Sequence, residues 1–138
     1  MKPMMITQQD EMGCGAACVA YVANISYEHA ASMLGKDKAS SVGFRCKELT
    51  NVLTQLGHPY IHKHTNSIQE KRLLKQNGTI VFIKRSSRYP YGHYLVRSGD
   101  RWGDPWINLV TNKSLSSAKA GFRKRLPAQV QWVLLPIV

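Results

Sequence analysis

The chain has 138 residues, which is enough for one domain with a modest core. With 43% hydrophobic and 20% charged residues, its composition is that of a globular protein rather than a disordered one. The apolar runs at residues 79–83 and 130–138 are far shorter than the ~20 residues of a membrane helix. The apolar stretch at the N-terminus is also too short for a signal peptide, because polar residues follow it early. We therefore expect no membrane span and a cytoplasmic location, although an effector exported without a cleaved signal would share these features.

The first half of the chain has the pattern of helices. Residues 14–24 place apolar side chains at the i, i+3, i+4, i+7 and i+8 positions, which predicts a core-facing helix that ends near Asn24. Residues 26–34 begin with a serine suited to an N-cap and are followed by a glycine, so a short helix is expected there. Two further helices are predicted over residues 43–56 and 67–76.

The second half of the chain changes to strands. Residues 79–83 form a β-branched and aromatic run that is typical of a buried strand. We expect four strands in all, over residues 79–83, 93–97, 101–106 and 131–135. The Gly99-Asp100 pair between the second and third strands is a strong hairpin signal.

Helices followed by an antiparallel sheet predict an α+β fold. We expect a single domain over residues 1–138, with a helical part at about 1–78 and a sheet part at about 79–138. A helix that presents a cysteine would pack against that sheet.

The three cysteines are an odd number without framework spacing, so a disulfide scaffold is not expected. Cys14 and Cys18 are four residues apart and would share one helix face, which leaves a zinc site as an alternative. No second compact Cys/His pair completes such a site, so we predict no metal and no cofactor. Cys18 and Cys46 are interpreted as small core residues.

Cys14 stands where the first helix begins. A cysteine attacks as its thiolate, and the partial positive charge of a helix N-terminus favours that form. Gly13 and Gly15 flank it, and we expect them to leave Cys14 open to a substrate backbone.

The predicted hairpin brings a histidine to an aspartate. A two-residue loop at Gly99-Asp100 pairs Ser98 with Arg101, which makes His93 and Asp104 diagonal neighbours on one face of the sheet. Asp104 can then accept a hydrogen bond from one ring nitrogen of His93 and orient the other toward Cys14. A cysteine–histidine pair with a third, orienting group is the arrangement of a thiol hydrolase.

Gln8 lies six residues before Cys14. Its side-chain amide and the backbone N–H of Cys14 can converge on a developing oxyanion. Taken singly, each of these residues also has an ordinary structural explanation, such as a buried inert cysteine or a strand-end turn at Asp104-Pro105. Their order and their places on helix and strands favour a site.

These residues carry a resemblance to a known family. The segments Gln8…Cys14-Gly15-x-Ala17, Gly92-His93-Tyr94-Leu95-Val96 and Asp104-Pro105 resemble the bacteriocin-processing peptidases of the C39 family. The segment from Gly43-Phe44 to Leu56-Gly57 also resembles the second helix region of that family, and the similarity spans roughly residues 6–106.

The resemblance implies a papain-like cysteine peptidase fold and cleavage of leader peptides after a double glycine. It implies that Cys14 is the nucleophile, His93 the general base and acid, Asp104 the residue that orients His93, and Gln8 the oxyanion donor. Members of the family are usually the N-terminal domain of an ABC exporter. No transporter follows in this sequence, so we expect a stand-alone domain.

The positive charge lies in the second half of the chain. Residues 61–138 hold fourteen Lys/Arg and three Asp/Glu, whereas residues 1–60 hold five of each, so the later segment supplies the whole net charge of +11. Such asymmetry indicates an acidic partner, which is an acidic peptide or protein substrate, a nucleic acid or an anionic membrane. A solubilising surface without a specific partner is the simpler alternative.

Three functions remain open. The leading interpretation is a papain-like cysteine peptidase that uses a Cys-His-Asp triad. The second is a toxin or effector on the same scaffold that acts on RNA, with Tyr89 and Tyr91 stacking on bases. Its basic patch would comprise Lys84, Arg85, Arg88, Arg97, Arg101, Arg123, Lys124 and Arg125. The third is a non-catalytic peptide-binding domain, against which the presence of Cys14, His93 and Asp104 argues.

Overall fold

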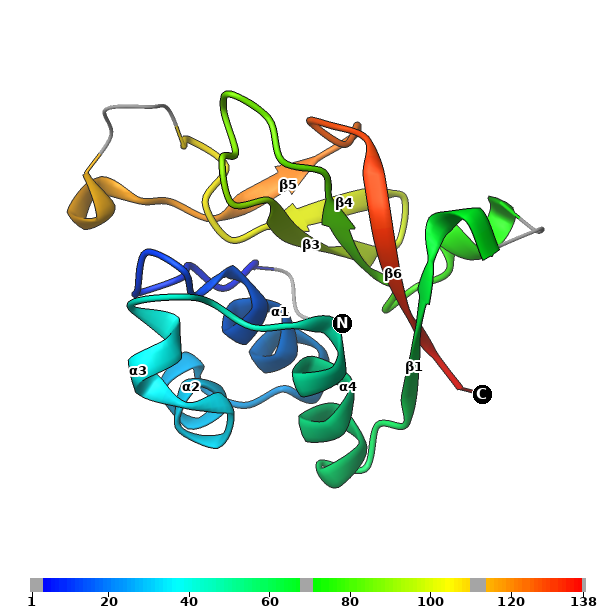
Figure 1. Ribbon diagram of the computed structural model, residues 1–138, viewed down its shortest axis with the longest axis horizontal. Coiled ribbons are helices and arrows are strands. Elements are labelled where there is room, and N and C mark those ends of the chain that lie inside the picture. Colours follow the sequence, from blue (N-terminus) through cyan, green and yellow to red (C-terminus); the bar gives the residue numbers. More distant parts are fainter. Residues whose placement is uncertain (1–3, 68–70, 110–113, 138) are drawn as a thin grey trace.

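A computed structural model describes residues 4–67, 71–109 and 114–137. Within these ranges the helices are α1 (Cys14–Ala23), α2 (Tyr27–Leu34), α3 (Lys36–Ala39) and α4 (Cys46–Gln55). They lie together on one side of the molecule, and the strands lie on the other (Figure 1). No helix in the described part of the chain is long and apolar enough to cross a membrane.

The first two helices begin and end as predicted. α1 stops where Asn24 adopts the left-handed conformation, at a φ of 58°. The Ser26 side chain accepts a hydrogen bond from the His29 N–H at 3.0 Å, which satisfies one of the free donors at the start of α2. Gly35 follows α2 at a φ of 118°, a conformation that favours glycine.

The later helices differ from the prediction. The helix expected over residues 43–56 begins only at Cys46, because Gly43 has a φ of +76° and Arg45 is extended. α3 was not predicted, since four residues show no helical period. Of the helix expected over residues 67–76, the described part is a 3-10 helix, Lys71–Lys75, which follows another at Thr65–Ser67; residues 68–70 lie outside the described ranges.

Six strands form one antiparallel sheet in the order β1-β6-β2-β3-β4-β5 among the residues described. They are β1 (Tyr60–His64), β2 (Ile80–Ile83), β3 (His93–Ser98), β4 (Arg101–Asp104), β5 (Gly121–Arg123) and β6 (Val130–Pro136). The predicted α+β fold is therefore confirmed. The predicted boundary at residue 78 is wrong, since β1 lies in the range assigned to the helical part and pairs with β6.

The β3–β4 hairpin has the predicted register. Ser98 pairs with Arg101 and Val96 with Gly103, and Gly99 takes a φ of +62° in the loop. β4 ends at Asp104 rather than at Trp106. Pro105 has no N–H for the sheet, and the Asp104 carboxylate accepts the Trp106 N–H at 2.9 Å, which closes a turn.

The core lies on both faces of the sheet. α1 is buried on nearly all sides, from Gly15 to Tyr21, and packs on β3 through a cluster that includes Tyr94 and Val96. Leu95, which points to the opposite face, belongs to a second cluster. The predicted packing of a cysteine-bearing helix on the sheet is thus confirmed, and it sets the start of α1 beside the start of β3.

Candidate active site

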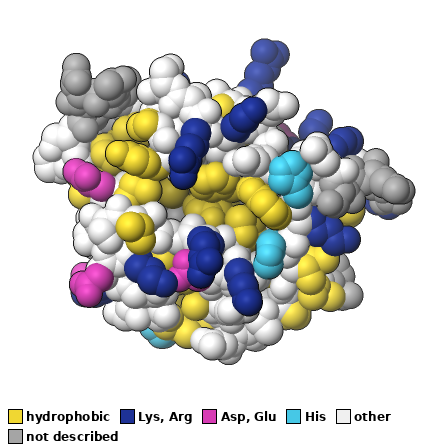
Figure 2. All heavy atoms as spheres, in the orientation of Figure 1, with side chains coloured by type: hydrophobic (Ala, Val, Ile, Leu, Met, Phe, Trp, Pro, Cys, Tyr) yellow, Lys and Arg dark blue, Asp and Glu magenta, His cyan; other side chains and the backbone are white. Residues whose placement is uncertain are grey.

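Cys14 is the first residue of α1 and lies half-buried on the wall of a cleft of about 860 Å³. The cleft runs between the helices and the loop that joins β2 to β3. In Figure 2 it is seen as an apolar hollow with Lys and Arg side chains around it. Since Cys14 is the first helical residue, its backbone N–H has no acceptor within α1 and is free to bind an oxyanion.

The two glycines beside Cys14 do not serve the predicted purpose. Both are buried. A Cβ on Gly13 would lie 1.9 Å from the Tyr27 hydroxyl oxygen, and a Cβ on Gly15 would lie 3.1 Å from Leu49. Close packing by Tyr27 and Leu49 favours glycine at these two positions. Both glycines are buried, so the expectation that they admit a substrate backbone was wrong.

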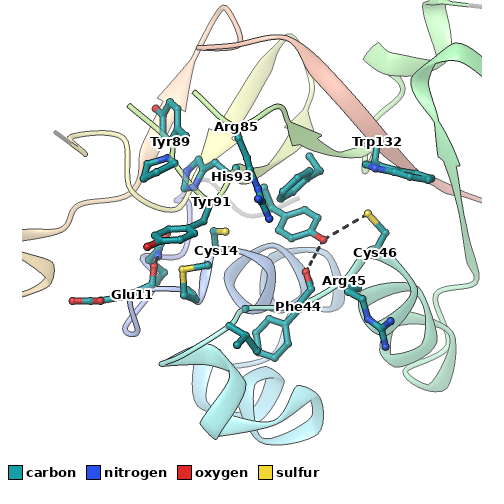
Figure 3. Close-up of a pocket in the computed structure, with 18 of the residues that line it drawn as sticks. Glu11, Cys14, Phe44, Arg45, Cys46, Arg85, Tyr89, Tyr91, His93 and Trp132 are labelled. Atoms are coloured by element: carbon teal, nitrogen blue, oxygen red, sulfur yellow. Dashed lines mark hydrogen bonds between the residues drawn. The ribbon is translucent and has the colours of Figure 1, made fainter. Parts of the chain in front are cut away.

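His93 and Asp104 meet as the hairpin geometry predicted. The Nε2 atom of His93 lies 2.7 Å from Oδ1 of Asp104, with both side chains almost wholly buried. The other ring nitrogen, Nδ1, is left for Cys14, whose thiol is near enough to His93 to help raise its pKa. Figure 3 shows the His93 ring above Cys14 in the cleft. Helix α1 and the sheet therefore bring together the three residues predicted to form a triad.

The charge state of His93 follows from these contacts. Burial by itself lowers the pKa of a histidine, but the hydrogen bond to Asp104 and the proximity of Cys14 raise the pKa of His93 from 6.5 to about 9. At neutral pH the ring is therefore held as an imidazolium between two acidic groups.

Asp104 is completely buried and fully bonded. Oδ1 also accepts the Trp106 N–H, and Oδ2 accepts a hydrogen bond from Nη1 of Arg123 at 3.1 Å. Burial raises the pKa of a carboxyl group, but the hydrogen bond and charge of His93, with the bonds from Trp106 and Arg123, hold the pKa of Asp104 below its usual range. The carboxylate therefore stays charged and fixed beside His93.

Arg123 is a site residue that sequence reasoning did not identify. It ends β5, which pairs with β4 so that Gly121 lies opposite Asp104. The sequence placed it in a general basic patch, because a strand of three residues has no readable alternation. The one available signal was that a carboxylate buried in a strand needs ionic and hydrogen-bonding partners.

Tyr89 also has a role different from the predicted one. Its ring stacks on the His93 ring, with centroids 5.0 Å apart and planes at 19°, and it is only 1% exposed. Tyr89 thus covers one face of His93 and is not available to stack on a base. Tyr91, in contrast, is 65% exposed at the edge of the cleft.

Gln8 lines the same cleft and is 3% exposed. Its Nε2 donates to the backbone carbonyls of Asp10 and Glu11, each at 3.0 Å, and its Oε1 is buried without a partner among the described residues. Both amide hydrogens thus hold the loop before Cys14. The donor role of Gln8 stays a prediction, which requires one of these bonds to be released when substrate binds.

The other two cysteines differ from each other. Cys18 is fully buried, as predicted, and burial raises the pKa of its thiol. Cys46 is only partly a core residue: it packs against the core cluster but is half-buried on the cleft wall, 3.6 Å from the Tyr94 hydroxyl oxygen. In the described part of the chain, no group of three or more His, Cys, Asp or Glu side chains is placed to hold a metal.

The eight cations assigned to one basic patch differ in their surroundings. Arg97 is 8% exposed and lies over the Trp102 ring, and Arg123 binds Asp104. Arg85 and Arg88 line the cleft instead. The predicted patch is therefore wrong for Arg97 and Arg123, whose positive charges are used within the fold.

No protein-family model matches the sequence, and no curated protein matches it significantly. A solved structure does match the fold: the peptidase domain of Streptococcus ComA, a bifunctional ABC transporter involved in a quorum-sensing pathway. The TM-score is 0.58 at 15% sequence identity, and the alignment covers 98% of each chain. At this identity the likeness concerns the fold alone. The chain has the α+β fold of the ComA peptidase domain, with helices followed by a six-stranded antiparallel sheet.

Proposed function

We propose that the protein is a papain-like cysteine peptidase that hydrolyses a peptide bond through Cys14, His93 and Asp104. The observation that carries this proposal is the position of His93, which is bonded through Nε2 to Asp104 and lies above Cys14 in the cleft (Figure 3). Likeness to the ComA peptidase domain supports the choice of a peptide as substrate. The resemblance of the motifs to bacteriocin-processing peptidases makes a Gly-Gly site the first to test.

The chemistry follows from the geometry. The Cys14 sulfur attacks the carbonyl carbon, and the Cys14 backbone N–H binds the oxyanion, with Gln8 as the second proposed donor. His93 gives its proton to the leaving amine as the C–N bond breaks, which leaves a thioester on Cys14. Water then attacks the thioester and gives a proton to His93, and the C–S bond breaks to release the carboxylic acid.

The test combines thiol labelling with hydrolysis. We expect iodoacetamide to label Cys14 faster than Cys18 or Cys46 between about pH 5 and about pH 9, and His93→Ala to slow that labelling. A peptide library with Gly-Gly sites should be cleaved by the wild type and not by Cys14→Ala, and His93→Ala should slow cleavage by roughly a hundred- to ten-thousand-fold.

Cys46 provides an internal control for labelling, because it lines the same cleft and burial raises the pKa of its thiol. If Cys14 labels no faster than Cys46, and His93→Ala leaves its rate unchanged, the proposed thiolate–imidazolium pair does not exist.

A further inference from the structure

The cleft carries more positive charge than the proposed chemistry uses. Five Lys and Arg residues line it against two Glu residues. The cations are Lys38, Arg45, Lys47, Arg85 and Arg88. This excess of positive charge lies in the same cleft as Cys14 and His93, so it affects which ligands the cleft can bind.

The two walls of the cleft each hold an unbalanced cation. Lys38 and Arg45 both pair with Glu48, which neutralises that carboxylate. In contrast, Lys47 on α4 and Arg85 on the β2–β3 loop form no ion pair within the described residues. A ligand in the cleft therefore meets an available cation on the helical wall and another on the opposite wall.

The charge is unevenly distributed along the cleft. In Figure 3, Arg85 points into the cleft between His93 and Trp132, and Arg45 lies on the helical wall at the same end. Glu11 lies at the other end, beyond Cys14. The end with Arg85 and Arg45 therefore has an excess of cations, whereas the other end holds Glu11 as well as Arg88, which lies over the Tyr89 ring.

Between these walls the cleft surface is apolar. Phe82 and Tyr94 pack with ring centroids 4.8 Å apart, and both line the cleft with Phe44 and Trp132. Val42, on the rim, is 74% exposed. A surface of this kind fits a segment with apolar side chains on one side and carboxylates at its edges.

We propose that the end of the cleft between α4 and the β2–β3 loop binds an acidic, partly apolar segment of the peptide substrate, with Arg85 and Lys47 contacting carboxylates from opposite walls. This inference rests on the proposed peptidase function and names its substrate class. A peptide can carry carboxylates at just the positions that face Arg85 and Lys47 and uncharged side chains elsewhere. RNA carries a phosphate at every nucleotide, so a strand along the cleft would bring a phosphate toward the Glu11 carboxylate at the end beyond Cys14, and the arrangement favours a peptide.

The test uses the Cys14→Ala protein and binding rather than cleavage. The probes are three fluorescein-labelled amphipathic peptides with the same leucine face, whose remaining positions are glutamate, glutamine or lysine. By fluorescence anisotropy at low salt we expect the glutamate peptide to bind about tenfold more tightly than the glutamine peptide, because two charge-assisted contacts are gained. High salt should reduce that difference.

Charge reversal assigns the effect to the cleft. Arg85→Glu and Lys47→Glu should each reduce the preference for glutamate, and the double variant should prefer the lysine peptide. Lys124→Glu is the matched control, because Lys124 is exposed and does not line the cleft. None of these substitutions changes the apolar lining residues Phe44, Phe82, Tyr94 and Trp132, and the folding of every variant is checked by circular dichroism.

Three results would overturn the inference. They are equal binding of the glutamate and glutamine peptides, the same loss of preference in Lys124→Glu, and displacement of the glutamate peptide by an RNA oligonucleotide of equal charge at lower concentration. Because Cys14→Ala cannot form a thioester, binding is read independently of cleavage. Peptide cleavage without preference for acidic segments would reject this inference alone, whereas acidic preference without cleavage would reject the peptidase proposal alone.

Discussion

At the scale of single residues, the site depends on how a buried carboxylate is kept charged. Asp104 has no exposed surface, so its charge must be balanced within the protein. His93 binds Oδ1 and Arg123 binds Oδ2, which gives the carboxylate a cationic partner on each oxygen. We regard Arg123 as a positioning residue that acts on His93 through Asp104.

Arg123→Gln should therefore destabilise the protein in a manner that depends on pH. The variant should lose about 1–3 kcal/mol at neutral pH, since Oδ2 loses its charged donor. Because the folded-state pKa of Asp104 lies below 3.8, its contribution is complete above that pH and is lost as pH falls through the folded value. Urea unfolding should thus show a difference between variant and wild type that shrinks on acidification.

Arg123→Lys is the matched control for this prediction, because it retains the charge. Peptide hydrolysis should slow in Arg123→Gln and recover in Arg123→Lys. A destabilisation of Arg123→Gln that is equal at neutral and acidic pH would contradict the electrostatic role.

At the scale of elements, the start of α1 is fixed by a contact between distant parts of the helical half. The Tyr27 hydroxyl of α2 donates to the Asp10 carboxylate at 2.7 Å, and the Gly13 N–H donates to the Asp10 carbonyl at 3.0 Å. Gly13 lies against that hydroxyl, where a Cβ has no room. The loop that precedes Cys14 is therefore held by α2.

Gly13→Ala should destabilise the protein by about 1–3 kcal/mol, because its Cβ would collide with the Tyr27 hydroxyl. Removing that hydroxyl relieves part of the collision. In chemical denaturation, Gly13→Ala should therefore cost less in a Tyr27→Phe background than in the wild type. Strictly additive costs would show that the hydroxyl does not set the limit at Gly13.

At the scale of the whole molecule, the three residues of the site join its two layers. Cys14 belongs to α1, whereas His93 and Asp104 belong to β3 and β4. The charges of Cys14 and Asp104 both help to raise the pKa of His93, so its protonation is linked to the folded arrangement of helices and sheet.

Global stability should consequently fall as pH rises from neutral. The pKa of His93 is about 9 in the folded state against 6.5 ordinarily, so its contribution is complete below pH 6.5 and is lost as pH rises to about 9. The shift corresponds to a loss on the order of 3 kcal/mol. Urea unfolding across this range should show the loss in the wild type and not in His93→Gln; an equal loss in both would assign it to other groups.

Local chain chemistry was enough to predict much of this fold. The apolar period of residues 14–24 and the caps at Asn24 and Ser26 act through neighbouring residues, and these helices were confirmed. The Gly99-Asp100 loop sets a register by its length alone, which is why the His93–Asp104 contact was predictable. The α+β order likewise follows from the change of period along the chain.

Only the tertiary structure decided the contacts between segments whose own residues show no helix or strand pattern. β1 exposes three of its five residues and β5 has three residues in all, so both are recognisable as strands only through the partners they pair with. The contact of Arg123 with Asp104 depends on the pairing of β5 with β4. The cleft between α4 and the β2–β3 loop forms only where the helices pack on the sheet. The sequence by itself placed Cys14 at the start of a helix and His93 near Asp104, because a helix boundary and a short hairpin loop are set locally. The packing of α1 on the sheet brought Cys14 to His93, and packing also decided which cations contact Asp104 and which face the cleft.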